Sequence, residues 1–165
     1  KEITEVYCGN GRGKTTLAIG QALRASSQGK SVIIIQFLKG NERRELDFLE
    51  ELDQLDIKIF RFEKMETCYD QLNEEEQVEE ERNILNGLNF ARKVIATQEC
   101  DFLVLDEILG LLDKHIATVD MVVGLLKQKD ESMHLILTGN RVDPGILDYV
   151  DSVTTITTLG REQNS

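Results

Sequence analysis

The chain has 165 residues, of which 30% are charged, and a formal net charge of −11 at pH 7. That length is most simply one domain with a sizeable hydrophobic core. The negative charge argues against nucleic acid or an anionic membrane as the main partner, and no apolar stretch is long enough to span a membrane.

Three cysteines, Cys8, Cys68 and Cys100, are scattered along the chain and form no C-x-x-C pair. An odd, widely spaced set argues against a zinc or dithiol site and is typical of proteins in a reducing compartment. We therefore expect a cytoplasmic protein whose cysteines are packing residues.

Strands and helices are predicted to alternate along the whole chain. Apolar runs rich in β-branched residues predict the strands Ile3–Cys8, Val32–Phe37, Ile57–Phe62, Phe102–Asp106, Leu135–Thr138 and Val153–Thr158. Helical patterns and start signals predict helices over Gly13–Ser26, Arg44–Leu52, Asn73 to about Thr97 and Val119–Lys127, and one that begins at Asp143. This alternation indicates an α/β fold with a mostly parallel six-stranded sheet and helices on both faces. We expect residues 1–159 to form this single domain and residues 160–165 to be a disordered tail.

Two of these helices carry clear start signals. Asn73 is followed three residues later by Glu76, which predicts a capping box. Asp143 precedes Pro144, and proline is favoured at the first helical position. The helix after Asn73 opens with the run EEEQVEEE. We interpret this run as a solvated helix start favoured by the helix dipole, with a cation patch as the alternative.

A glycine-rich turn between the first predicted strand and the first predicted helix has the composition of a phosphate-binding loop. Glycines let the backbone fold around an anion with its N–H groups inward, and the helix adds its positive N-terminal end. Lys14 is predicted to reach the outer phosphates, and the Thr15 hydroxyl to ligate Mg²⁺. The predicted nucleotide-binding residues of this loop are Gly9, Asn10, Gly11, Arg12, Gly13, Lys14, Thr15 and Thr16.

This loop is one residue shorter than the usual P-loop. The usual pattern places four residues between its first glycine and the Gly-Lys pair. Only three residues separate Gly9 from Gly13, and Cys8 stands where the longer spacing would put a glycine. The loop is therefore a variant, and the variation restricts which P-loop proteins the chain can resemble.

An acidic pair ends the fourth predicted strand, in the sequence FLVLDE. Apolar residues that end in carboxylates match the Walker B pattern, and ligands of open parallel sheets bind at the carboxyl ends of strands. The phosphate loop leaves the same edge of the sheet, so the two motifs should converge. Asp106 or Glu107 is then predicted to hold Mg²⁺, directly or through water.

Two other strand ends place basic residues at that edge. Arg141 follows the strand LILT, where it could contact the nucleotide or a second substrate, or be an exposed turn residue. Lys39 follows the second strand and could face an anion. His115 and His134 are isolated and have no predicted partner, so covalent catalysis by a Ser-His or Cys-His pair has little support.

These motifs occur in the order VYCGNGRGKTT, VIIIQFLKG, FLVLDE and LILTGNR followed by PGILDYVD. From Ile3 to Val153 the chain resembles the ATP:corrinoid adenosyltransferases of the P-loop type. The resemblance implies a RecA-like sheet, a homodimer, and ATP and Mg²⁺ bound with the nucleotide reversed in the loop. It also implies transfer of the 5′-deoxyadenosyl group to Co(I) of a reduced corrinoid, with triphosphate as the leaving group.

The resemblance further implies roles for particular residues. Lys14, Thr15 and Glu107 would stabilise the departing triphosphate, and Thr15, Glu107 and Asp106 would hold Mg²⁺. The chain has no reducing centre of its own, so an external electron donor, in this family a flavoprotein, is implied.

Two alternatives remain open at the level of sequence. A P-loop kinase or NTPase would have a loop of ordinary length and an arginine-rich lid, and neither is found. A nucleotide-binding paralogue with reduced catalysis is the other alternative. It is suggested by the segment Met65–Leu72, where Tyr69 is the only aromatic residue, and by the missing basic, aromatic tail after Leu159.

Overall fold

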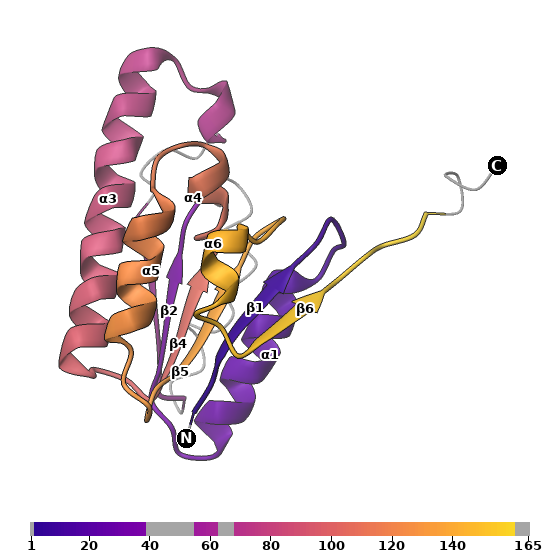
Figure 1. Cartoon of the computed structure of the whole chain (residues 1–165). Coiled ribbons are helices and arrows are strands. Elements are labelled where there is room, and N and C mark those ends of the chain that lie inside the picture. Colours follow the sequence, from indigo (N-terminus) through magenta and orange to yellow (C-terminus); the bar gives the residue numbers. More distant parts are fainter. Residues whose placement is uncertain (1, 39–54, 63–67, 161–165) are drawn as a thin grey trace.

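The computed structural model describes residues 2–38, 55–62 and 68–160, in which strands and helices alternate (Figure 1). The strands are β1 (Thr4–Cys8), β2 (Val32–Gln36), β3 (Ile57–Arg61), β4 (Phe102–Asp106), β5 (His134–Thr138) and β6 (Ser152–Thr155). The helices are α1 (Lys14–Ser27), the 3₁₀ turn η2 (Tyr69–Gln71), α3 (Glu74–Thr97), α4 (Gly110–Asp113), α5 (Val119–Gln128) and α6 (Pro144–Leu147). The predicted helix Arg44–Leu52, Lys39 and residues 161–165 of the predicted tail lie outside the described residues.

The six strands form one sheet in the order β3-β2-β4-β5-β1-β6. Every neighbouring pair is parallel, which confirms the predicted α/β fold. β4 and β5 lie between β2 and β1, so the chain crosses the sheet after its first strand. All carboxyl ends meet at one edge, and the segments that follow β1, β4 and β5 therefore lie near one another.

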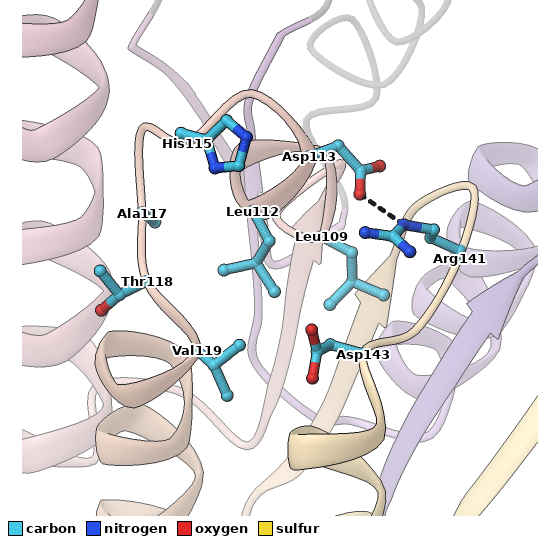
Figure 2. Close-up of a pocket in the computed structure, with 9 residues that line it drawn as sticks. All are labelled: Leu109, Leu112, Asp113, His115, Ala117, Thr118, Val119, Arg141 and Asp143. Carbon is cyan, nitrogen blue, oxygen red and sulfur yellow. Dashed lines mark hydrogen bonds and ion pairs between the residues drawn. The ribbon is translucent and has the colours of Figure 1, made fainter.

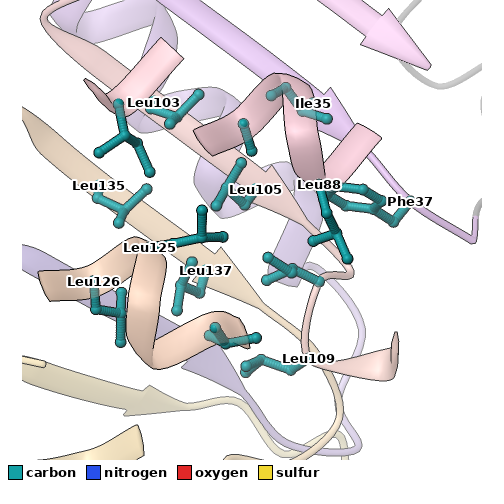
Figure 3. Close-up of a cluster of buried hydrophobic side chains, with 14 of the residues drawn as sticks. Ile35, Phe37, Leu88, Leu103, Leu105, Leu109, Leu125, Leu126, Leu135 and Leu137 are labelled. Atoms are coloured by element: carbon teal, nitrogen blue, oxygen red, sulfur yellow. The ribbon is translucent and has the colours of Figure 1, made fainter. Parts of the chain in front are cut away.

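Helices cover both faces of the sheet. Side chains alternate along each strand, so the apolar strands present hydrophobic side chains to both faces. On β2, Val32 and Ile34 pack with α1, whereas Ile33 and Ile35 belong to the larger cluster with α3 and α5 (Figure 3). All five residues of β2 and all five of β4 are buried. β6, at the edge, is mostly exposed and ends at Thr155, three residues before the predicted end.

The predicted helix starts are confirmed. The Asn73 side chain accepts from the Glu76 N–H at 2.9 Å, and the Glu76 carboxylate accepts from the Asn73 N–H at 3.1 Å. Asp143 accepts from the N–H of Gly145 at 2.8 Å, with Pro144 at the first position of α6. α4 and η2 were not predicted, because four and three residues are too few to show a helical period.

Three expectations about single residues are wrong. His134 does have partners, because its ring nitrogens contact Glu2 and Glu5, which are 132 and 129 residues away in sequence. Glu80 in the acidic run is only 2% exposed and accepts a hydrogen bond from Asn83. Cys68 is exposed, so only the other two cysteines are packing residues.

Within the described residues, no helix combines the length and apolar character that crossing a membrane requires.

Two helical glycines provide a matched test of this packing. A Cβ on Gly87 of α3 would lie 2.8 Å from the Phe62 ring and 2.9 Å from the Phe37 ring, whereas a Cβ on Gly20 of α1 meets nothing within 4 Å. Gly87→Ala is expected to lower the free energy of unfolding by about 1–3 kcal/mol through overpacking. Gly20→Ala should raise it by about 0.5–1 kcal/mol through helix propensity. Urea denaturation measures both, and equal effects of the two variants would contradict the described contact of α3 with these rings.

Candidate nucleotide-binding site

The phosphate loop joins β1 to α1, as the sequence predicts. Gly9 and Gly13 have φ angles of 112° and 99°, in the left-handed region that glycine tolerates. Gly13 is the N-cap of α1 and provides no capping side chain. The first amides of a helix have no intrahelical acceptor, so the start of α1 offers N–H groups and a positive dipole end to an anion.

A segment from the far end of the described chain lies directly against this loop. The Gly11 N–H donates to the Ile156 carbonyl at 2.9 Å, and the Arg12 N–H donates to the Thr158 hydroxyl at 2.8 Å. A Cβ on Gly9 or Gly11 would lie 2.3 or 2.7 Å from Ile156 backbone atoms. Glycine at both positions is therefore required by the close approach of two backbones, a constraint that the loop sequence alone does not reveal.

Lys14 folds over the loop. Its Nζ donates to the carbonyls of Gly9 at 2.6 Å and Gly11 at 3.2 Å, and to Oδ1 of Asn140 at 3.2 Å. The Asn140 carbonyl also accepts from the Gly9 N–H at 2.8 Å. Asn140 was not among the predicted site residues, although its position directly after β5, at the binding edge of the sheet, was the available signal.

The predicted convergence of Thr15 and Asp106 is observed. Asp106 is 1% exposed, and its carboxylate accepts from the Thr15 hydroxyl at 3.0 and 3.2 Å. It also accepts from the Thr138 hydroxyl at 2.7 Å and from the Gln36 amide at 3.1 Å. Because the Thr15 hydroxyl donates its hydrogen bond to Asp106, its oxygen has the orientation in which it can serve as an acceptor or a cation ligand.

Glu107 leaves β4 with a φ of 64°, a left-handed conformation that is costly for a residue with a Cβ. Its N–H donates to the Thr138 hydroxyl at 2.7 Å, which fixes the turn. A Cβ on Gly110 would lie 3.1 Å from Oε2 of Glu107, so the carboxylate lies against the start of α4. Asp106 and Glu107 therefore differ in setting: the first is buried in a hydrogen-bond network, and the second extends from a strained turn.

The oxygen atoms of Thr15, Asp106 and Glu107 are the hard ligands that Mg²⁺ prefers. In the described ranges no group of three or more His, Cys, Asp or Glu side chains is arranged to hold a metal ion. A few oxygen ligands without a full protein cage fit Mg²⁺, which usually takes one or two protein ligands and completes its shell with water and phosphate oxygens.

Arg141 lies beside the loop but points elsewhere. Its Nε donates to Asp113 at 2.8 Å, and this hydrogen bond and charge raise the pKa of the guanidinium. It lines a cavity of about 280 Å³ between α4, the start of α5 and the start of α6 (Figure 2). Leu109, His115 and Asp143 also line this cavity. The structure does not join Arg141 to Lys14 or Asp106 by any described contact, so its role towards a substrate stays a prediction.

Tyr69, the only aromatic residue of the segment Met65–Leu72, is held by the helices around it. Its hydroxyl donates to Glu81 of α3, and burial together with that carboxylate raises its pKa to about 12. Lys114 lies 5.8 Å from the Tyr69 ring centroid and forms an ion pair with Asp70 at 2.7 Å. These contacts fasten η2 to α3 and to the end of α4.

A parallel sheet whose first strand leads through a glycine-rich loop into a helix, with a buried aspartate facing that loop, defines a P-loop nucleotide-binding protein. A KaiC-like protein from Pyrococcus horikoshii has the same RecA-like fold, with a TM-score of 0.60 and 18% identity over 96% of this chain and 74% of that one. The sequence model of the ATP:corrinoid adenosyltransferase BtuR/CobO/CobP family matches residues 1–163, and the chain belongs to this family.

Two relatives that carry the name of this activity agree with the assignment. The corrinoid adenosyltransferase of Escherichia coli (strain K12) is 30% identical over 154 residues, which cover 90% of this chain and 73% of that protein. The corrinoid adenosyltransferase of Salmonella typhimurium is 28% identical, with the same coverage. An uncharacterized protein of Nostoc sp. is 31% identical over 88% of this chain and 41% of its own length. The chain is accordingly an enzyme of the corrinoid adenosyltransferase type.

The contact between Thr158 and the loop yields a prediction. Thr158→Val keeps the shape of the side chain but removes the acceptor of the Arg12 N–H, and Thr158→Ser keeps the acceptor. We expect the valine variant to bind ATP about fivefold more weakly, the effect of about 1 kcal/mol for one hydrogen bond, and the serine variant to bind normally. Calorimetric titration measures both, with Thr157→Val as the neighbouring control. Equal affinities of the valine and serine variants would show that this hydrogen bond does not shape the loop.

Proposed function

We propose that this enzyme transfers the 5′-deoxyadenosyl group of ATP to Co(I) of a reduced corrinoid and releases triphosphate. The observation that carries the proposal is the convergence of Lys14, Thr15 and Asp106 at a shortened phosphate loop, in a chain that the family model matches over nearly its whole length. ATP-dependent adenosylation of corrinoids is the activity of that family. The proposal adds which bond breaks and what each of these residues does.

The reaction moves one electron pair to carbon and another to oxygen. Co(I) donates its pair to ribose C5′, the bond between C5′ and its phosphate oxygen breaks, and the triphosphate leaves with the electrons of that bond. No proton has to be removed from the nucleophile, so no general base is needed. Negative charge increases on the triphosphate, and stabilising that charge is the main electrostatic task of the protein.

Lys14 is the main cation for this task. Its ammonium already bridges the carbonyls of Gly9 and Gly11 across the mouth of the loop. We propose that phosphate oxygens replace these carbonyls when ATP binds. Lys14 would then hold the loop together without nucleotide and neutralise the triphosphate charge when ATP is bound. The amides at the start of α1 and the helix dipole add fixed positive charge at the same place.

Bound Mg²⁺ would supply further neutralisation of the triphosphate, as it does in other phosphate-binding enzymes. We propose Thr15, Asp106 and Glu107 as the residues that hold it. Asp106 accepts a hydrogen bond from the Thr15 hydroxyl and so turns the oxygen lone pairs outwards, while Glu107 extends from the strained turn after β4. The other residues from Gly9 to Thr16 and Arg141 complete the proposed nucleotide and substrate contacts.

The cellular setting is proposed on chemical grounds. Co(I) is a strong reductant that has to be generated, so we propose an external electron donor, a flavoprotein. The free cysteines Cys8, Cys68 and Cys100 support a reducing cytoplasm. We propose a homodimer built from one nucleotide-binding domain, residues 1–159, in each subunit, and mass measurement in solution tests the dimer.

Lys14→Ala tests the role of the ammonium. We expect formation of the cobalt–carbon bond under strong chemical reduction to slow by about 10²–10³-fold, the usual cost of removing a charge-stabilising donor. Arg24→Ala, which removes a positive charge from the exposed face of the same helix, should leave the rate unchanged. The change in the corrinoid absorption spectrum measures both rates, and an undiminished rate in the Lys14 variant would refute the mechanism.

Product analysis separates this reaction from phosphoryl transfer. We expect one triphosphate for each adenosylated corrinoid and no ADP, because the bond that breaks lies at ribose C5′. Anion-exchange chromatography of the reaction mixture distinguishes these products. ADP formed in proportion to turnover would instead indicate a kinase or NTPase.

A further inference from the structure

Four neighbouring strands end in polar residues that lie in one row across the sheet. In the register, Arg61 of β3 pairs with Gln36 of β2, and Gln36 pairs with Asp106 of β4. Leu105 pairs with Leu137, so Thr138 of β5 follows beside Asp106. Alternate residues of a strand face the same side of the sheet. Each residue of the row stands an even number of positions from a residue that packs on the α1 side, as Gln36 does from Ile34. The row therefore lies on the face of the sheet that α1 covers, and Asp106 contacts the first turn of that helix.

Hydrogen bonds connect this row from end to end. Nε of Arg61 donates to Oε1 of Gln36 at 3.1 Å, and Nε2 of Gln36 donates to Oδ2 of Asp106 at 3.1 Å. Asp106 in turn accepts from Thr15 of α1. Gln36 and Asp106 are 2% and 1% exposed, so water does not readily replace either partner.

The chemistry of the row gives glutamine a particular role. A guanidinium can only donate and a carboxylate can only accept, so the residue between them needs one acceptor end and one donor end. A glutamine side chain has both, and Arg61 and Asp106 together fix its orientation. With Oε1 held by the guanidinium, the NH₂ group necessarily faces Asp106.

We propose that Arg61 and Gln36 are positioning residues that orient the Asp106 carboxylate and, through it, the Thr15 hydroxyl. Arg61 holds Oε1 of the Gln36 amide, Gln36 sets the rotation of the carboxylate, and the carboxylate accepts the hydrogen bond of the Thr15 hydroxyl. The lone pairs of Thr15 are thereby turned towards the triphosphate and its cation. The inference rests on the proposed function for the identity of the nucleotide, but Mg²⁺–ATP binding reports on the row without adenosyl transfer.

The central experiment compares Arg61→Met with Arg61→Lys. Methionine cannot donate to Gln36, so Oε1 of the amide loses its partner and the amide is held at one end only, whereas lysine keeps a donor at the end of an unbranched chain. We expect Arg61→Met to weaken ATP binding about fivefold to tenfold in the presence of Mg²⁺ and not in EDTA, and to lower kcat by a similar factor. The KM for the corrinoid should not change, and Arg61→Lys should recover most of both losses.

Gln36→Glu and Lys58→Met complete the design. Glutamate at position 36 keeps the bond to Arg61 but loses the donor to Asp106, so it should reproduce the Mg²⁺-dependent loss. Lys58 is exposed on the same strand as Arg61, and its replacement removes one charge without touching the row. Thermal unfolding of every variant separates misfolding from positioning, and if a Gln36 variant unfolds, Arg61 near the sheet edge still decides the question.

Three results would overturn the proposal. One is ATP affinity in Arg61→Met that equals the wild type with Mg²⁺ present. The second is a loss in Arg61→Met that has the same size in EDTA as in Mg²⁺. The third is a loss in Lys58→Met as large as that in Arg61→Met, because either of these would indicate a general charge effect. Failure of the wild type to adenosylate a corrinoid would refute the proposed function alone, because the binding comparison does not need that step.

Discussion

The buried carboxylate of Asp106 is the interaction around which the binding edge of this protein is organised. An anion that is 1% exposed is costly unless donors surround it. Its donors come from Gln36, Thr138 and Thr15, and therefore from β2, β5 and α1. Satisfying this one charge requires three strands in the correct register and the first helix directly above them. The same requirement places the start of α1, and with it the phosphate loop, at the carboxyl edge of the sheet.

The loop itself is shaped by the backbone that runs past it. Ile156 approaches Gly9 and Gly11 so closely that neither position has room for a Cβ, and Thr158 takes the N–H of Arg12. Some of the loop amides are thus used by the protein rather than by a ligand. The start of α1 offers its amides, and the Lys14 ammonium, now held by loop carbonyls, is the group that we propose turns to the triphosphate.

Asp106 and Glu107 differ in their surroundings because their backbone conformations differ. Asp106 ends the regular strand β4, and hydrogen bonds from the neighbouring strands determine the position of its side chain. Glu107 adopts a left-handed conformation, and this cost is offset by the bond from its N–H to Thr138. Strain of this kind gathers at functional sites, which supports the proposed role of Glu107 in holding a ligand.

Local signals in the sequence were enough to determine the fold class and the main binding motif. Periodicity located all six strands, capping chemistry located the starts of α3 and α6, and glycine spacing located the loop with Lys14 and Thr15. The partners of those residues were decided only by the tertiary structure. Asn140, Ile156 and Thr158 meet the loop across more than 120 residues, and Gln36 reaches Asp106 across 70. No local pattern encodes such contacts, because strand order and register, rather than neighbours in sequence, determine which side chains meet.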